Sequence, residues 1–184
     1  SSIGAQFQGE WALVSLSMTA LALGGMSQRF PASANSLQQE LDQIAARALS
    51  PELSAFDTTL WGAPALSALN TDAGHVGYLG HLALLLSVRE FLIPGGPHRP
   101  LLTHLCEALA RKIRRGACGL AETYPGETYF PDNAVALAAL SVAARAGIGA
   151  KETATGLLHS LHTRYADAHG LMPFRLGPGC TPLN

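Results

Sequence analysis

Residues 78–91 read YLGHLALLLSVREF, and this stretch decides the fold. Its apolar side chains would lie on nearly every side of a helix, and it lacks the alternation of polar and apolar residues that is typical of a strand. A helix that is apolar all round has to be enclosed by other elements. The stretch therefore predicts an inner, buried helix.

An amphipathic stretch follows this inner helix. Leu102, Leu105, Leu109 and Ile113 recur at spacings of three and four residues, which places them in one apolar stripe along a helix. The sequence Pro-Gly-Gly-Pro at residues 94–97 separates the two stretches and indicates a tight turn. Together they predict a helical hairpin with one buried and one striped helix.

The same pair of stretches occurs once before and once after this hairpin. Residues 9–29 are apolar nearly all round and precede a stripe at 37–48, while residues 134–144 are rich in Ala, Leu and Val and precede a stripe at 157–165. The unit repeats with a period of roughly 60–70 residues, which indicates a repeat architecture. We predict an all-α fold in which residues 1–184 form one domain of three consecutive helical hairpins, with the apolar helices inside.

Composition and charge argue against a nucleic-acid partner and against a membrane-spanning segment. The chain has 184 residues, of which 48% are hydrophobic and 14% charged, and its formal net charge is -1. A nucleic-acid-binding domain needs a basic face, so we expect no nucleic-acid partner. The longest apolar stretch, residues 11–23, contains Ser and Thr and is shorter than the roughly 20 residues that a bilayer requires. We therefore expect no transmembrane segment.

The three cysteines have no metal-type spacing, and their number is odd. Cys106 lies among the leucines of a striped helix, whereas Cys118 and Cys180 fall in loops. A disulfide needs Cα atoms within about 7 Å of each other, so we predict that Cys106 pairs with neither. Cysteine usage leaves the compartment undecided, and an extracytoplasmic location is a working hypothesis.

Two motifs resemble a known superfamily. Residues 129–134 read Tyr-Phe-Pro-Asp-Asn-Ala and open an inner helix, and residues 169–174 read His-Gly-Leu-Met-Pro-Phe after an outer helix. With the hairpin repeat, they resemble the (α/α) toroids of the six-hairpin glycosidase-like superfamily. The resemblance implies an active site at the N-terminal ends of the inner helices.

The chain also differs from this superfamily, because six hairpins close such a ring and this chain has three. The difference implies that the chain belongs to a longer protein, that another copy completes the ring, or that the curve stays open. In the first two cases a further domain or a homo-oligomer would cover the apolar concave face, which would otherwise exceed the few hundred Å² that soluble monomers expose.

The loops that enter the inner helices carry most of the candidate functional residues. In the predicted layout, loops at residues 54–62, 74–80, 119–133 and 167–177 share one end of the molecule. Their carboxylates and aromatic rings suit a polyhydroxylated ligand, whose C–H faces stack on rings and whose hydroxyls donate to carboxylates. The candidate catalytic residues are Glu122, Glu127, Asp57, Asp132 and His75, and the candidate substrate-binding residues are Trp61, Tyr78, Tyr124, Tyr129, Asn133 and Arg175.

Each candidate also has a structural interpretation. Asp132 stands where a helix N-cap would be, and Glu122 and Glu127 could hold backbone amides of their loop. His75 and His81 are six residues apart and do not share a helical face, which argues against a zinc pair.

Three classes of function stay open on the sequence. A carbohydrate-active enzyme of the hydrolase, epimerase or lyase type fits the two carboxyl groups of glycoside hydrolysis and the His and Tyr residues that transfer protons. The alternatives are a non-catalytic helical scaffold or binding module, and a toroid enzyme for an apolar, isoprenoid-like substrate. No nucleotide-binding, serine-hydrolase or metal motif occurs, so we expect no cofactor and no metal, and a small-molecule or oligosaccharide ligand.

Overall fold

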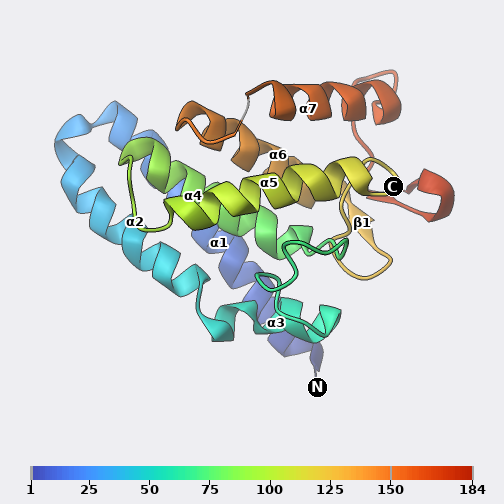
Figure 1. The fold of residues 1–184 in the computed structure, drawn as a ribbon, viewed down its shortest axis with the longest axis horizontal. Coiled ribbons are helices and arrows are strands. Elements are labelled where there is room, and N and C mark those ends of the chain that lie inside the picture. The colour runs from blue at the N-terminus through green and yellow to red at the C-terminus, as the bar shows by residue number, and fades with distance from the viewer. Residues whose placement is uncertain (1, 150, 184) are drawn as a thin grey trace.

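The computed structural model describes residues 2–149 and 151–183, and most of these are helical (Figure 1). The prediction of an all-α fold is therefore confirmed. The helices are α1 (Ser2–Arg29), α2 (Ala34–Ala48), α3 (Pro51–Trp61), α4 (Val76–Leu92), α5 (Arg99–Arg115), α6 (Phe130–Arg145) and α7 (Lys151–Tyr165), with short 3-10 turns at η1 (Pro31–Ser33) and η2 (Pro178–Cys180). Among the described residues, β1 (Thr128–Tyr129), β2 (Arg175–Leu176) and β3 (Pro182–Leu183) form a small antiparallel sheet in the order β1-β2-β3. No helix in the described ranges is both long and apolar enough to cross a bilayer.

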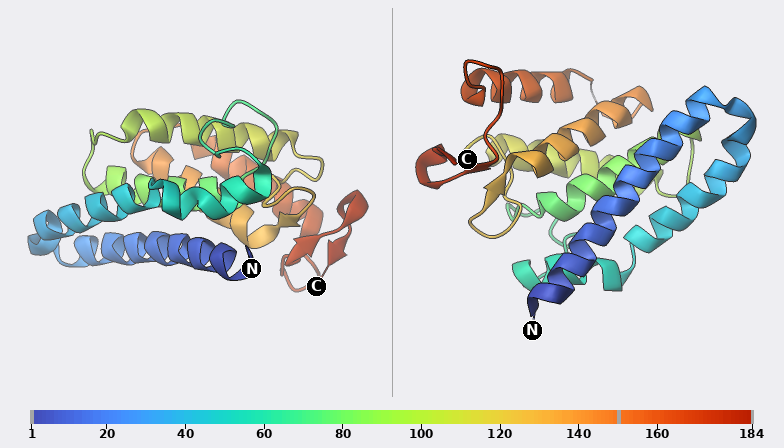
Figure 2. Two further views of the ribbon diagram at one scale, coloured as in Figure 1. Left: turned by 90° about the horizontal axis from the view of Figure 1, so that it is seen from below. Right: turned by 180° about the vertical axis from the view of Figure 1, so that it is seen from behind.

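Helices α1 and α4 lie side by side and run in the same direction (Figure 2). Ser17 of α1 hydrogen-bonds His81 of α4. Seven residues further along both helices, Gly24 of α1 lies against the side chain of Val88. Because the contacts advance together in the two helices, the helices are parallel.

Helix α6 continues this parallel row on the other side of α4. Gly80 of α4 lies against the first turns of α6, where an added Cβ would be 3.3 Å from the backbone nitrogen of Ala136. Seven residues further along α4, the hydroxyl of Ser87 donates to the carbonyl of Ala139 at 3.1 Å. The N-terminal ends of α4 and α6 therefore meet at one end of the molecule.

Replacing Gly80 with valine is expected to destabilise the fold by about 1–3 kcal/mol, the usual cost of inserting methyl groups into a packed interface. The extra carbon atoms would press on the backbone of α6, which cannot move aside as a flexible side chain does. Chemical denaturation measures the loss. The same substitution at Gly25 of α1 is the control, because a Cβ there meets nothing within 4 Å. Equal effects at the two positions would contradict the close packing of α4 on α6.

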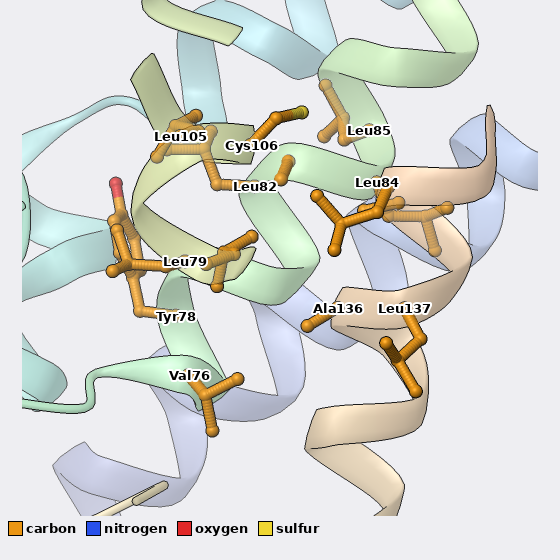
Figure 3. Packing of buried hydrophobic residues seen from close by; sticks show 14 of the residues in the cluster. Val76, Tyr78, Leu79, Leu82, Leu84, Leu85, Leu105, Cys106, Ala136 and Leu137 are labelled. Atoms are coloured by element: carbon orange, nitrogen blue, oxygen red, sulfur yellow. The ribbon is translucent and has the colours of Figure 1, made fainter. Parts of the chain in front are cut away.

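The outer helices α2, α5 and α7 each pair with the inner helix that precedes them in the chain. The predicted stripe of α5, Leu102, Leu105, Leu109 and Ile113, is fully buried. Figure 3 shows leucines of α4 placed between α5 on one side and Ala136 and Leu137 of α6 on the other. The apolar stripe thus holds each outer helix against the inner row.

The inner helices differ in how far the chain encloses them. Helix α4 is buried along nearly its whole length, as its sequence predicts. Helix α1 is not enclosed, because Trp11, Met18, Leu21 and Met26 are 61%, 40%, 45% and 50% exposed. The sequence predicts that three hairpins leave an apolar face uncovered, and in this chain the uncovered apolar side chains belong to α1, which has neighbours on one flank.

The predicted loop at residues 54–62 is also wrong, because residues 54–61 belong to α3. Ser50 accepts a hydrogen bond from the Leu53 amide, Pro51 occupies the first turn, and Gly62 ends the helix in the left-handed conformation at φ 74°. An N-cap Ser followed by Pro and a C-terminal Gly are the usual boundaries of a helix. Helix α4 likewise begins at Val76, so the predicted loop at residues 74–80 is mostly helix.

At the opposite end of the inner helices, Glu90 organises the turn between α4 and α5. Its carboxylate is 2% exposed and accepts hydrogen bonds from the amides of Gly95 at 2.7 Å and Gly96 at 3.0 Å. Arg99 donates to the same carboxylate at 2.6 Å. This end of the bundle is therefore held by a charged network.

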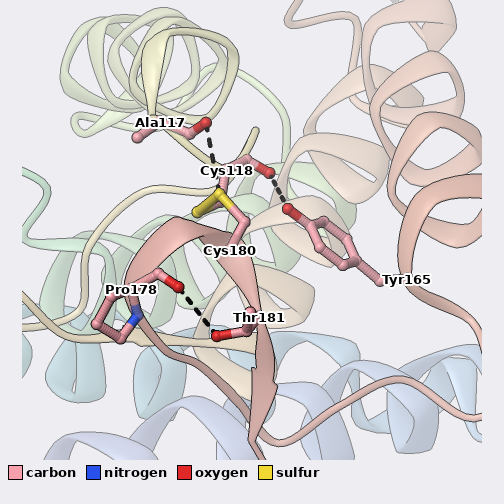
Figure 4. The surroundings of a disulfide bond; sticks show 6 residues. All are labelled: Ala117, Cys118, Tyr165, Pro178, Cys180 and Thr181. Carbon is pink, nitrogen blue, oxygen red and sulfur yellow. Dashed lines mark hydrogen bonds between the residues drawn. A yellow bond between two sulfur atoms is a disulfide. The ribbon is translucent and has the colours of Figure 1, made fainter.

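A C-terminal strap, residues 166–183, returns across the end where the inner helices begin. A disulfide between Cys118 and Cys180 fastens it to the loop after α5 (Figure 4). The hydroxyl of Tyr165 donates to the carbonyl of Cys118 at 2.7 Å, which ties the end of α7 to the same point. Cys106 is free and buried, so the prediction that it pairs with neither other cysteine is confirmed.

Candidate functional site

The loop before α6 is folded into a fixed shape. Thr123 and Glu127 are joined by a backbone hydrogen bond of 2.8 Å across a tight turn, where Gly126 takes φ 77°. The side-chain amide of Asn133, which is fully buried, donates to the carbonyl of Ala121 at 3.0 Å and accepts from its amide at 2.9 Å. Asn133 thus positions the loop from inside.

The same loop lies directly against the start of α4. The amide of Val76 donates to the carbonyl of Glu122 at 3.2 Å, and an added Cβ at Gly74 would collide with the backbone of Glu122. Glycine is therefore needed at position 74 for the two chain segments to approach. Glu122 itself is exposed.

Asp57 and His75 form a buried pair below this contact. Nδ1 of His75 lies 2.7 Å from Oδ2 of Asp57, and both side chains are 1% exposed. Trp61 stacks on the imidazole with ring centroids 4.5 Å apart. Burial raises the pKa of the Asp57 carboxyl, and the bond to His75 opposes that rise. The other oxygen, Oδ1, is buried without a hydrogen-bond partner in the described part of the chain.

The backbone conformation of His75 indicates that this residue fixes the start of α4. It takes φ 51° at the N-cap of α4, a conformation that is uncommon for residues other than glycine and that persists where the surroundings enforce it. The bonds to Asp57 and the stacked Trp61 are such surroundings. His75 and Asp57 therefore fix the start of α4, and neither is among the side chains that line the pocket described next.

Thr123 connects this buried cluster to the surface. Its carbonyl accepts from Nε1 of Trp61 at 3.2 Å, and its hydroxyl donates to Oδ2 of Asp132 at 2.8 Å. Asp132 belongs to the first turn of α6, whose N-cap is Tyr129. The interpretation of Asp132 as an N-cap is therefore wrong, because its carboxylate is held from outside the helix.

An open pocket of about 740 Å³ lies where the inner helices begin. One wall comes from α1 and the other from α6, the loop before it and the strap, with α4 between them. Carboxylates and aromatic rings share its lining. The lining residues are Glu10, Trp11, Val14, Met18, Leu60, His81, Tyr124, Glu127, Tyr129, Pro131, Asp132, Val135 and Phe174.

The carboxylates in this pocket have different surroundings. Burial raises the pKa of Asp132 and the charge of Glu10 raises it further, while the hydrogen bond from Thr123 acts in the opposite direction. Glu127 is half-buried and accepts a hydrogen bond of 2.7 Å from the hydroxyl of Tyr129. Arg175 lies 3.8 Å from the same carboxylate oxygen. Asp132 thus keeps its proton to a higher pH than an ordinary aspartate does, and Glu127 stands beside a cation.

The strap completes the pocket wall. Phe174 packs edge-on against the Tyr129 ring at a centroid distance of 5.5 Å, and Tyr124 meets Tyr129 at 6.3 Å. The guanidinium of Arg175 lies over the same Tyr129 ring, 5.4 Å from its centroid. Tyr129 is therefore held on three sides with its hydroxyl directed to Glu127.

The structure brings together part of the predicted site. Of the predicted residues, Glu127, Asp132, Tyr124 and Tyr129 line the pocket. The others, apart from Tyr78, lie beside the pocket: Asp57, His75 and Trp61 form the buried cluster, Glu122 accepts from α4 through its backbone, Asn133 holds the loop, and Arg175 flanks Glu127.

Tyr78 was predicted to bind substrate, but it does not line the pocket. Its ring is 1% exposed, and its hydroxyl donates to the carbonyl of Ala48 at the end of α2. Helix α4 begins at Val76, so Tyr78 already belongs to the helix. At that helical position its side chain points into the core, toward α2 and α3.

Nine of the thirteen lining residues were not among the predicted site residues, and three of these nine, Glu10, Trp11 and His81, bring polar or ring side chains from α1 and α4. Glu10 and Trp11 lie in α1, more than a hundred residues from the loop that they face, and nothing local in the sequence links the two. His81 follows Gly80, whose small size is the only signal of a close approach there. For all three, the parallel packing of α1 on α4 creates the site.

Across the described residues, no group of three or more His, Cys, Asp or Glu side chains is arranged to hold a metal ion. No model of a known protein family matches the chain, and no curated protein matches it.

Proposed function

We propose that this pocket binds a carbohydrate and that the chain forms the site-bearing part of a carbohydrate-active (α/α) toroid enzyme. The observation that carries the proposal is the joint lining of one open pocket by four aromatic side chains and three carboxylates. Aromatic faces stack on sugar rings, and carboxylates accept their hydroxyls. The parallel start of α4 and α6 at the pocket fits the position of the site in such toroids.

The carboxylates support a division of roles in glycoside hydrolysis. Asp132 is the general acid, because burial and the charge of Glu10 keep its proton on at higher pH than an ordinary aspartate. It would give that proton to the leaving oxygen of the glycosidic bond. Glu127 or Glu10 would act as the base or the nucleophile on the other face of the sugar. Epimerase and lyase chemistry are the related alternatives within the same class.

The other two classes fit the pocket less well. A dry, closed, apolar cavity would favour an isoprenoid-like substrate, and this pocket is open and holds three carboxylates. A non-catalytic binding module is the second candidate, because the exposed apolar side chains of α1 extend from the pocket along the helix. A further domain or a second copy of the chain over that face is compatible with either.

Binding and turnover test the proposal in two steps. Isothermal titration with maltose, cellobiose and xylobiose is expected to detect binding of at least one disaccharide, and Tyr124→Ala to weaken it. With aryl glycosides of the sugar that binds, Asp132→Asn and Glu127→Gln are each expected to lower kcat by about 10²–10⁴-fold, the usual worth of a general acid or base. The thermal midpoint should change little.

Asp72→Asn is the matched control, because this carboxylate is 86% exposed and lies outside the pocket. It is expected to keep both binding and turnover. Disaccharide binding without turnover in the wild-type protein would support the binding module instead. If none of the three sugars binds, the carbohydrate proposal is wrong.

A further inference from the structure

His81 is a buried polar side chain at the base of the pocket. It lines the pocket from α4, between the walls contributed by α1 and α6, and it is 5% exposed. Its Nδ1 lies 2.7 Å from the hydroxyl oxygen of Ser17. Ser17 is the hydrogen-bond partner of this imidazole among the described residues.

Ser17 decides which nitrogen of His81 carries the proton. The hydroxyl of Ser17 has one proton, and it donates to the carbonyl of Val14 one turn earlier in α1 at 2.9 Å. The oxygen of Ser17 is then free to accept, so Nδ1 of His81 is the donor. In a neutral imidazole only one nitrogen is protonated, and Nε2 is therefore an acceptor.

Nε2 faces the pocket. The buried side-chain nitrogens and oxygens without a hydrogen-bond partner, in the described part of the chain, are Asp57 Oδ1 and Arg175 Nε. Among the described residues Nε2 of His81 has no hydrogen-bond partner, and it does not belong to that set, so it reaches the pocket surface. Burial also lowers the pKa of His81 to about 4, which keeps the ring neutral near neutral pH.

We propose that Nε2 of His81 is the hydrogen-bond acceptor at the base of the pocket and binds a hydroxyl group of a neutral sugar. The inference rests on the proposed carbohydrate function and narrows it. A ligand has to present a hydroxyl at this point, because a buried acceptor left without a donor is costly. A hydrocarbon that fills the same volume is rejected for that reason.

His81 and Asp132 then offer one ligand a hydrogen-bond acceptor and a hydrogen-bond donor. Asp132, when protonated, donates from the wall formed by α6, and His81 accepts at the base. Glu10 and Glu127 are the other charged groups in the lining, and both only accept when ionised. A sugar, whose hydroxyls donate and accept, satisfies this set, whereas an aliphatic chain satisfies none of it.

Nitrogen-15 NMR of the histidine rings tests the acceptor directly, without any ligand. We expect the His81 ring to be the Nδ1–H tautomer at pH 7 and to remain neutral at pH 5, where exposed histidines are protonated. In Ser17→Ala the tautomers should mix, because Nδ1 loses its acceptor. An Nε2–H tautomer or a protonated ring in the wild-type protein would overturn the proposal.

Sugar binding tests the role of the acceptor. With the disaccharide that binds the wild-type protein best, His81→Phe is expected to weaken binding about tenfold, equivalent to about 1.4 kcal/mol. His81→Gln places an amide oxygen near Nε2 and should retain more of the affinity. His104→Phe, at an exposed position of α5, is the control and should bind as the wild type does.

The outcomes separate this inference from the proposed function. If a disaccharide binds and His81→Phe binds it equally well, His81 is not the acceptor while the carbohydrate function stands. If no disaccharide binds the wild-type protein, both fail, and binding of farnesol would then identify an apolar ligand. If His81→Phe does not fold, the shift of the wild-type Nε2 resonance on addition of the sugar decides, and its absence overturns the inference.

Discussion

Replacing Glu90 with alanine is expected to lower the free energy of unfolding by about 3 kcal/mol, because breaking a buried ion pair leaves its partners uncompensated. The carboxylate is 2% exposed and holds two backbone amides as well as Arg99. Arg99 is 39% exposed, so it regains water, and the expected loss lies at the lower end of the range for buried pairs. Urea denaturation with a two-state fit measures it.

The pH dependence of this loss is a second readout. Burial opposes ionisation of Glu90, but the hydrogen bonds from Gly95, Arg99 and Gly96 outweigh it and lower the pKa below the ordinary value of 4.5. A depressed pKa of a carboxyl group stabilises the folded state above the unfolded pKa, and this stabilisation disappears as the pH falls through the folded pKa. The difference in the free energy of unfolding between wild type and Glu90→Ala should thus have its full value above pH 5 and shrink in acid.

Glu107→Ala, at an exposed position of α5, is the control and should change stability by less than about 0.5 kcal/mol. A similar loss in both variants would contradict the role assigned to Glu90.

Removing the disulfide by the double substitution Cys118→Ser and Cys180→Ser is expected to cost about 4 kcal/mol. The two cysteines are separated by 62 residues, and in the chain-entropy account a cross-link over a loop of that length constrains the unfolded chain by about this amount. The strap that carries Phe174 and Arg175 would also lose its anchor beside Tyr129. Denaturant unfolding measures the cost, and the near-ultraviolet signal of Tyr129 and its neighbours reports the strap.

A reducing agent provides the control for this variant. It should lower the stability of the wild-type protein by the same amount and leave the double variant unchanged, because Cys106 is free and buried in both. If reduction does not alter the wild-type unfolding midpoint, the disulfide is not a stabilising link. A disulfide of this kind persists in oxidising compartments, and the extracytoplasmic location stays a hypothesis.

The sequence was most informative where one physical requirement governs a whole helix. The stripe of α5 and the all-round apolar surface of α4 were predicted because each helix must bury that surface, and the structure places both in the core. For α1 the argument reaches less far, since an apolar surface shows that a helix needs a neighbour but not that this chain supplies one, and three hairpins were expected to leave an apolar face uncovered. Helix α3 was missed because residues 54–62 were predicted as a loop, although Ser50 with Pro51 and Gly62 are helix boundary signals.

The site could be predicted only in part for a related reason. Glu127, Tyr129 and Asp132 belong to one loop and the helix that it enters, so their proximity is a local property of the chain. Glu10 and His81 enter the pocket through the packing of α1 on α4, and helix-to-helix register is not encoded in either segment alone. The buried Asp57–His75 pair has the residue types of a catalytic site, but both side chains are 1% exposed and neither lines the pocket.

Each hairpin closes over a short length of chain, whereas the inner row packs α1 on α4 and α4 on α6, which are further apart in sequence. Local contacts of the first kind form fast. The sheet is different, because β1 precedes α6 and β2 follows α7, and their strands can pair only after the third hairpin has closed. The strap and the pocket wall that it carries are therefore expected to become ordered late in folding.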